Sequence, residues 1–189
     1  MGIVDARTKQ VLAKLKGRDY IGFLDCSEEE TLALLDFADE LKKLHSTGVL
    51  HEFLKNKVLA MYFEKNSTRT RLSFEAGMTH LGGHAMFLSK NDLQLARVET
   101  IEDTASVISR FADAIMARLY KHSDALTIAK WAKVPFVNGL TDLEHPCQAL
   151  ADVMTIRERK GRLEGLELCF IGDAENNVCH SIMLAGAAL

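Results

Sequence analysis

Residues 67–71 read Ser67-Thr68-Arg69-Thr70-Arg71, and they stand between an apolar run, Val58–Phe63, and a segment with helical spacing of apolar residues, 72–81. The apolar run 58–63 is typical of a buried strand, and the pattern over 72–81 is typical of a helix. Backbone N–H groups at a helix start lack intrahelical acceptors and bind oxyanions. The strand-loop-helix order therefore predicts an anion site that hydroxyls and guanidinium groups reinforce. The alternative interpretation is a Ser/Thr helix cap with two solvated arginines.

Two further apolar runs also lead into polar residues. Residues 114–117 end in Arg118, and residues 134–137 lead through 138–140 to His145-Pro146-Cys147-Gln148. In open α/β sheets, ligands collect at the carboxyl ends of the strands. We therefore expect these segments to converge with residues 67–71 on one crevice.

Strand-like runs alternate with helical patterns along the chain. This alternation predicts βαβ units, and hence an α/β fold with a parallel sheet flanked by helices. A fourth strand is expected at 168–171, followed by a helix from Asn176. Helix starts are expected at Ser27, Thr100, Ser123 and Pro146, with ends at Gly48, Trp131 and Gly161.

Together these motifs resemble the aspartate/ornithine carbamoyltransferase family. The resemblance rests on residues 63–71, on Met116-Ala117-Arg118 and on His145–Gln148, and it extends from about Gly17 to the last residue. The D-x-x-x-S-M-G and H-C-L-P segments of the family's second half are missing, so the chain looks truncated. The expected division is a carbamoyl phosphate-binding domain (1–145), an interdomain helix and linker (146–164), and the truncated start of an amino-acid-binding domain with one βα unit (165–189).

The resemblance implies that the carbamoyl group of carbamoyl phosphate is transferred to an amine. Arg118 would contact both the phosphate and the carbonyl oxygen, His145 would donate to the same oxygen, and Gln148 would accept from the carbamoyl NH2 group. These three are the expected catalytic residues. The expected phosphate ligands are Ser67, Thr68, Arg69 and Thr70, with Arg71 supporting them from behind. The alternative for Arg118 is a surface salt bridge.

The acceptor implied by the resemblance is the side-chain amine of ornithine, giving citrulline and phosphate. Asn177 matches the asparagine that holds the ornithine backbone, and Asp173 is expected to end a strand at the crevice. Gln94 lies where the family extends a loop into a neighbouring subunit, which implies a homotrimer, although Ala96 and Val98 replace two glycines there. The alternatives are aspartate or putrescine as acceptor, or a noncatalytic binding or assembly module.

Composition narrows the function classes. The 189 residues are 48% hydrophobic and 26% charged, which suits one domain, or one domain plus a fragment. A net charge of −3 argues against a nucleic-acid surface. No apolar run approaches the ~20 residues that span a bilayer, and a signal-peptide core is missing, so a cytoplasmic protein without membrane contact is expected. No nucleotide-binding glycine motif is present.

No cofactor or metal site is expected. Cys26, Cys147, Cys169 and Cys179 form no C-x-x-C pair and are expected to be buried, reduced thiols. A nucleophilic role for Cys147 is the alternative, but packing is preferred because its neighbouring base, His145, has another role in the family. His80 and His84 flank a glycine helix stop and are expected to be surface residues.

Overall fold

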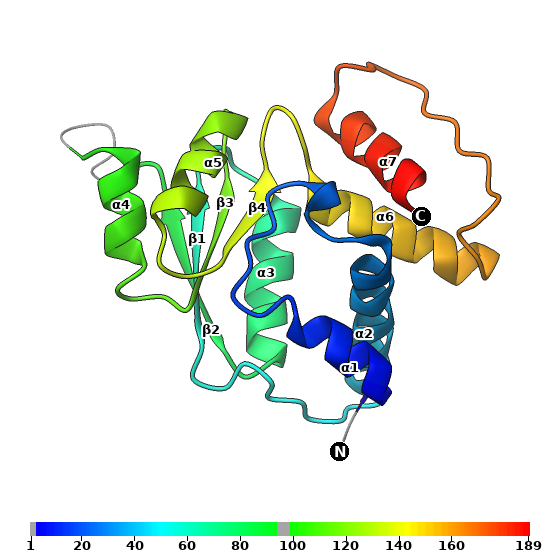
Figure 1. Ribbon diagram of the computed structural model, residues 1–189. Coiled ribbons are helices and arrows are strands. Elements are labelled where there is room, and N and C mark those ends of the chain that lie inside the picture. Colours follow the sequence, from blue (N-terminus) through cyan, green and yellow to red (C-terminus); the bar gives the residue numbers. More distant parts are fainter. Residues whose placement is uncertain (1–2, 94–98) are drawn as a thin grey trace.

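The computed structural model describes residues 3–93 and 99–189 (Figure 1). Four parallel strands form one sheet in the order β2-β1-β3-β4. The strands are β1 (Val58–Phe63), β2 (His84–Ser89), β3 (Ala114–Arg118) and β4 (Phe136–Leu140). The helices are α1 (Ala6–Ala13), the 3-10 turn η1 (Phe23–Asp25), α2 (Glu28–Ser46), α3 (Thr68–His80), α4 (Ile101–Ile108), α5 (His122–Trp131), α6 (Pro146–Lys160) and α7 (Asn177–Ala188). The predicted α/β class with a parallel sheet is confirmed.

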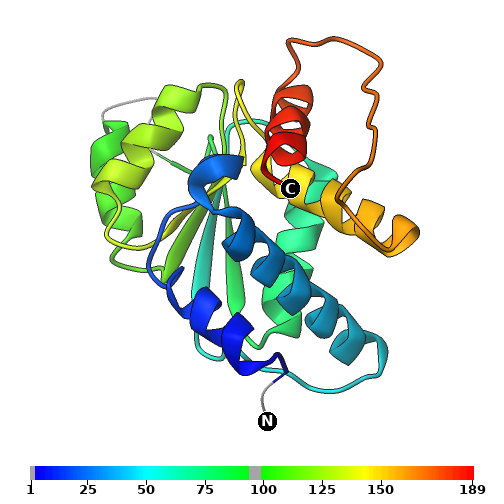
Figure 2. The same ribbon diagram turned by 45° about the vertical axis from the view of Figure 1, so that its right-hand side comes forward.

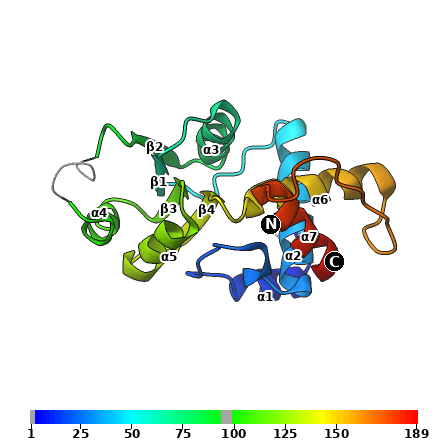
Figure 3. The same ribbon diagram turned by 90° about the horizontal axis from the view of Figure 1, so that it is seen from above.

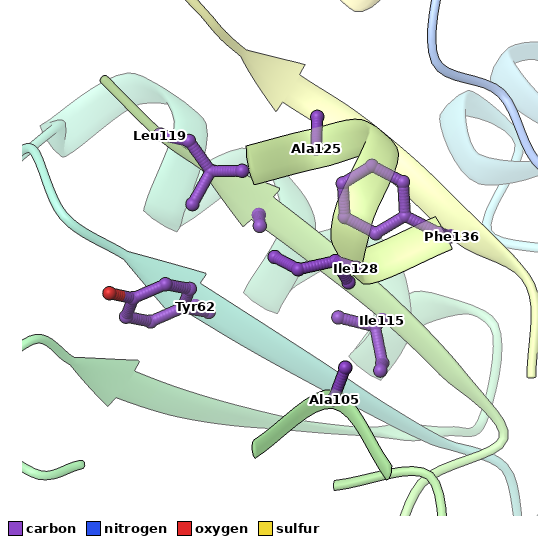
Figure 4. Packing of buried hydrophobic residues seen from close by; sticks show 8 residues of the cluster. Tyr62, Ala105, Ile115, Leu119, Ala125, Ile128 and Phe136 are labelled. Atoms are coloured by element: carbon purple, nitrogen blue, oxygen red, sulfur yellow. The ribbon is translucent and has the colours of Figure 1, made fainter. Parts of the chain in front are cut away.

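Helices cover both faces of the sheet, with α3 on one side and α4 and α5 on the other (Figure 3). Strand β1 is therefore buried on both faces, as parallel strands usually are. Leu59, Met61 and Phe63 pack with Met78 of α3. The opposite face is a second cluster (Figure 4), made of Tyr62, Ala105, Ile115, Ala117, Leu119, Ala125, Ile128 and Phe136. This burial fixes the strand ends from which the polar motifs emerge.

A third cluster joins the helices beside the sheet. Phe23 of η1 and Leu35 of α2 pack against Ala149 and Val153 of α6 and against Ile182 of α7. Figure 2 shows α7 (red) beside the first part of α6 (yellow), and these two helices are in direct contact. The segment after β4 is thereby held between the sheet and α7.

Most predicted helix boundaries are confirmed. Ser27 and Glu30 form the predicted capping box, and α6 begins at Pro146 and ends before Gly161, whose φ of 72° is left-handed. The prediction that Ser123 caps a helix is wrong. Helix α5 starts one residue earlier at His122, whose N–H donates to Asp142 Oδ1 at 2.7 Å. A side chain distant in sequence supplies the acceptor, which a local pattern does not show.

Two strand predictions need correction. Strand β2 was not predicted, and it pairs with the whole length of β1. Conversely, residues 168–171 form no strand, and Ile171 is 92% exposed. A strand needs a neighbouring strand to satisfy its backbone groups, and residues 3–93 and 99–189 offer none to this run. The third predicted strand is displaced, because β4 runs from Phe136 to Leu140 and includes the residues expected as a loop.

The prediction of buried thiols is confirmed at two positions. Cys26 and Cys179 are buried and Cys147 is partly buried, but Cys169 is exposed because the strand expected around it does not form. Within the described part of the chain, no three His, Cys, Asp or Glu side chains are grouped as metal ligands. None of the helices described is both long and apolar enough to cross a membrane.

Candidate active site

Ser67 begins the predicted anion site by capping α3. Its Oγ accepts from Thr70 N–H at 3.3 Å and donates to Thr70 Oγ1 at 3.0 Å. Thr70 Oγ1 also accepts from Arg118 Nη1 at 3.4 Å, so its own proton remains for an anion to accept. Thr68 and Arg69 occupy the exposed first turn, where backbone N–H groups have no intrahelical acceptor. The cap thus gathers backbone, hydroxyl and guanidinium donors.

Arg118 lies at the end of β3, beside the start of α3. Its Nε is buried and has no hydrogen-bond partner among the described residues. Burial, and then the nearby charge of Arg69, lower the pKa of Arg118. Within the same residues, neither arginine forms an ion pair with a carboxylate. Two neighbouring cations, one with a buried unpaired donor, make a site suited to a polyanion.

His145 faces the same cation from the turn after β4. Burial and the Arg118 guanidinium lower the pKa of His145 to about 4, so its imidazole is neutral at pH 7. Its Nδ1 is buried without a partner among the described residues. A neutral imidazole beside Arg118 avoids charge repulsion and still offers one N–H donor. The structure therefore brings Ser67, Thr70, Arg69, Arg118 and His145 together, as the sequence predicted.

Glu64 is a residue to which the sequence analysis gave no role. Its N–H donates to the Arg118 carbonyl at 2.9 Å, and its Oε2 accepts from Tyr120 N–H at 2.8 Å. Its Oε1 accepts from Tyr62 O–H at 3.2 Å. These bonds hold the end of β1 to the backbone around Arg118. A carboxylate directly after a buried strand was the available signal, but its partner Tyr120 lies 56 residues away.

Gln148 and Cys147 lie in the first turn of α6, next to His145. Gln148 Nε2 donates to Asp152 Oδ1 at 2.9 Å, which leaves the amide oxygen to accept from a ligand. Burial raises the pKa of Cys147 to about 12, and its Sγ donates to the Asn138 carbonyl at 3.5 Å. A protonated, hydrogen-bonded thiol is a poor nucleophile, which agrees with a packing role.

Three other predicted residues lie apart from this cluster or outside the description. Asn177 donates its amide Nδ2 to the Thr141 carbonyl at 2.5 Å, so it contacts the turn that leads to His145. Asp173 was predicted at a strand end, but it sits in an exposed turn and accepts from Glu175 N–H. Gln94, with Ala96 and Val98, lies outside the described residues.

An open cleft of about 430 Å³ adjoins the cap. It is lined by Asn66, Ser67, Thr68, Arg71, Leu72, Glu75 and Phe87. Arg71 pairs with Glu75 at 3.0 Å and lies over the Phe87 ring, 3.7 Å from its centroid. Its charge is therefore already partnered, which fits the predicted supporting role behind the phosphate ligands.

The lowered pKa of His145 predicts acid-sensitive stability. In the unfolded chain this pKa lies near 6.5, whereas in the folded chain it is about 4. Between these values the unfolded chain binds a proton that the folded chain does not, so the free energy of unfolding should fall as the pH is lowered. Melting temperatures between pH 7 and pH 4 should decline less steeply in His145→Gln than in the wild type. Parallel profiles would contradict the assignment.

Comparisons with known proteins agree with this geometry. Residues 18–158 match the family model described as "Aspartate/ornithine carbamoyltransferase, carbamoyl-P binding domain". Ornithine carbamoyltransferase of Pyrococcus horikoshii is 53% identical over 179 residues, which are 95% of this chain and 56% of the relative. Ornithine carbamoyltransferase of Carboxydothermus hydrogenoformans is 51% identical over 94% of this chain and 57% of its own length.

Solved structures give the same result. Ornithine carbamoyltransferase from Pyrococcus furiosus superposes with a TM-score of 0.88 at 53% identity, over 91% of this chain and 55% of that chain. The catalytic subunit of M. jannaschii aspartate transcarbamoylase superposes with a TM-score of 0.84 at 34% identity, over 90% of this chain and 57% of that chain. This chain thus spans a little over half the length of the relatives it matches. On the family model and these relatives, the chain belongs to the aspartate/ornithine carbamoyltransferase family and contains its carbamoyl phosphate-binding domain.

Proposed function

We propose that this chain binds carbamoyl phosphate and serves in the transfer of its carbamoyl group to the side-chain amine of ornithine, giving citrulline and phosphate. The observation that carries the proposal is a pair of buried nitrogens, Arg118 Nε and His145 Nδ1, which have no hydrogen-bond partner among the described residues and lie in one cluster with the Ser67 cap. An unpaired buried donor is costly, and a bound oxyanion would satisfy it.

The proposed residue roles follow from the donors available. The phosphate lies at the start of α3, where Ser67, Thr68, Arg69 and Thr70 supply hydroxyl, backbone and guanidinium groups. Arg118 and His145 donate to the carbonyl oxygen as negative charge develops on it. Gln148 accepts from the carbamoyl NH2 group through its amide oxygen.

In the proposed transfer, an uncharged amine attacks the carbamoyl carbon. The C–N bond forms while the carbonyl electron pair moves to the oxygen held by Arg118 and His145. Collapse of this intermediate breaks the C–O bond to phosphate, and the leaving phosphate takes the proton from the amine nitrogen. The chain's main contribution is to fix the anion and the carbonyl before attack.

We prefer ornithine to aspartate or putrescine as the acceptor because the three ornithine carbamoyltransferases named above are 51–53% identical to this chain, whereas the aspartate transcarbamoylase from M. jannaschii is 34% identical. Asn177 is the proposed contact for the ornithine backbone. We further propose that residues 1–145, 146–164 and 165–189 are the carbamoyl phosphate domain, the interdomain segment and the start of the amino-acid domain. On this division, the 189-residue chain alone should give little turnover, because only the start of the proposed amino-acid domain would be present to bind the acceptor.

The test is a binding and acceptor panel. Calorimetry should show carbamoyl phosphate binding to the 189-residue chain, with inorganic sulfate as the matched anion control binding more weakly. Transfer is then measured with ornithine, aspartate and putrescine, in a form that extends through the amino-acid half of the relatives. Ornithine should give the highest kcat/KM, since pocket contacts decide between acceptors. Preference for aspartate or putrescine would overturn the acceptor assignment.

A noncatalytic carbamoyl phosphate-binding or assembly module is the second candidate, supported by the match of residues 18–158 to a carbamoyl-P binding domain. Binding without citrulline formation in the extended form would support it. We also propose a cytoplasmic homotrimer in which Gln94 reaches the neighbouring active site. Sedimentation equilibrium tests the trimer, and a monomer at assay concentration would contradict it.

A further inference from the structure

The turn between β4 and α6, residues 141–145, is held by side chains of α7. Asn177 Nδ2 donates to the Thr141 carbonyl at 2.5 Å. One helical turn further, His180 Nδ1 lies 2.9 Å from the Leu143 carbonyl, so it donates in the tautomer with a proton on Nδ1. Because these residues are distant in sequence, the contacts fix the turn from outside.

The third contact reaches His145 itself. Ser181 is fully buried, and its Oγ accepts from the His145 backbone N–H at 2.9 Å. This N–H lies at the helix start and has no acceptor within α6. A serine on another helix therefore caps the residue that carries the imidazole.

Glu144 orients the Ser181 hydroxyl. Because Ser181 Oγ accepts from His145, its proton is free for Glu144 Oε2, which lies at 3.5 Å. The same Oε2 accepts from Phe23 N–H at 2.9 Å, and Glu144 is itself only 9% exposed. The bonds form one chain from η1 through Glu144 and Ser181 to the His145 backbone. The donor and the acceptor of each hydrogen bond are defined, so this series of bonds favours one orientation of the Ser181 hydroxyl.

We propose that Ser181 is a positioning residue for His145, and that α7 holds the 141–145 turn so that the imidazole meets the carbamoyl phosphate site. This inference rests on the proposed function, because it assigns His145 a ligand to meet. It also connects two proposed ligand-binding residues, since α7, which carries Asn177, holds the turn that carries His145. Ser181 itself touches no ligand in this scheme.

The test compares Ser181→Ala with Ser181→Cys and a surface control in the 189-residue chain. Ser181→Ala leaves the His145 N–H without its acceptor, whereas the near-isosteric Cys keeps a weak one. Thr155→Ala removes a hydroxyl whose only described bond is to the Ala151 carbonyl on the exposed side of α6, and it should change nothing at the site. Circular dichroism and melting temperature establish that each variant is folded.

Two readouts separate positioning from general stability. Carbamoyl phosphate affinity by calorimetry should fall about tenfold in Ser181→Ala and less in Ser181→Cys, as expected when the displaced His145 ring loses its one hydrogen bond to the ligand. NMR titration of the His145 ring, assigned with His145→Gln, should show its pKa rising from about 4 toward the ordinary histidine value in Ser181→Ala. The titration needs no ligand.

The outcomes distinguish this inference from the proposed function. Failure of the wild type to bind carbamoyl phosphate would refute the proposed function, while the ring titration would still report on the position of His145. Wild-type binding with unchanged affinity and ring pKa in a folded Ser181→Ala would overturn the positioning role. If Ser181→Ala is unfolded, the same criteria apply to Ser181→Cys.

Discussion

Replacing Arg118 by alanine is expected to weaken carbamoyl phosphate binding by about ten- to a hundredfold, because hydrogen bonds to charged groups contribute roughly 1.5–3 kcal/mol. Arg118 Nη1 also donates to Thr70 Oγ1, so the variant removes a donor from the cap as well as the guanidinium. Calorimetry of the 189-residue chain measures the affinity. In a form that catalyses transfer, losing a donor to the developing oxyanion should lower kcat by about 10²–10³.

The melting temperature of Arg118→Ala should change little. The native guanidinium is partly buried, its Nε has no hydrogen-bond partner among the described residues, and it forms no ion pair with a carboxylate there, so removing it relieves a desolvation cost. Arg118→Lys keeps the positive charge but loses the planar guanidinium. Its affinity for carbamoyl phosphate should lie between those of the wild type and Arg118→Ala. Arg110→Ala, an exposed arginine at the end of α4, is the matched control and should bind normally. Equal affinities in wild type and Arg118→Ala would remove this residue from the site.

Much of the site could be predicted from sequence because it is built from local signals. The Ser67 cap, the end of β3 at Arg118 and Pro146 as the first residue of α6 each depend on a short run of residues. Parallel pairing then brings the strand ends to one edge of the sheet. Local order plus topology was therefore sufficient to predict the meeting of Arg118 and His145.

The features that sequence could not supply depend on distant partners. Glu64 accepts a hydrogen bond from the Tyr120 backbone, and Ser181 accepts one from the His145 backbone. No local sequence motif connects the two residues of either pair. Strand β2 was missed although residues 85–88 form a four-residue apolar run, and pairing with β1 stabilises it. Residues 168–171 show the opposite case. This apolar run has no neighbouring strand among the described residues, and it forms no strand itself.

Replacing Phe136 by alanine is expected to lower the free energy of unfolding by about 3–5 kcal/mol, the usual cost of emptying a buried phenylalanine site. Phe136 is fully buried in the cluster between the sheet and helices α4 and α5, where it packs with Ile115 and Ile128 (Figure 4). The loss is large because a domain has only about 5–15 kcal/mol in total. Urea unfolding at constant m-value measures it.

Phe111→Ala is the matched control for Phe136→Ala, because Phe111 is 73% exposed and its loss should change the free energy of unfolding by no more than about 0.5 kcal/mol. The Phe136 carbonyl also accepts a hydrogen bond from Tyr20 N–H at 2.8 Å, and the substitution leaves this backbone bond in place. The folded fraction of Phe136→Ala should therefore retain carbamoyl phosphate affinity, since the cluster around the ring includes none of the proposed ligand residues that the structure describes. Equal stability losses in the two variants would contradict the burial of Phe136, and lost affinity in fully folded Phe136→Ala would show that the core shapes the site directly.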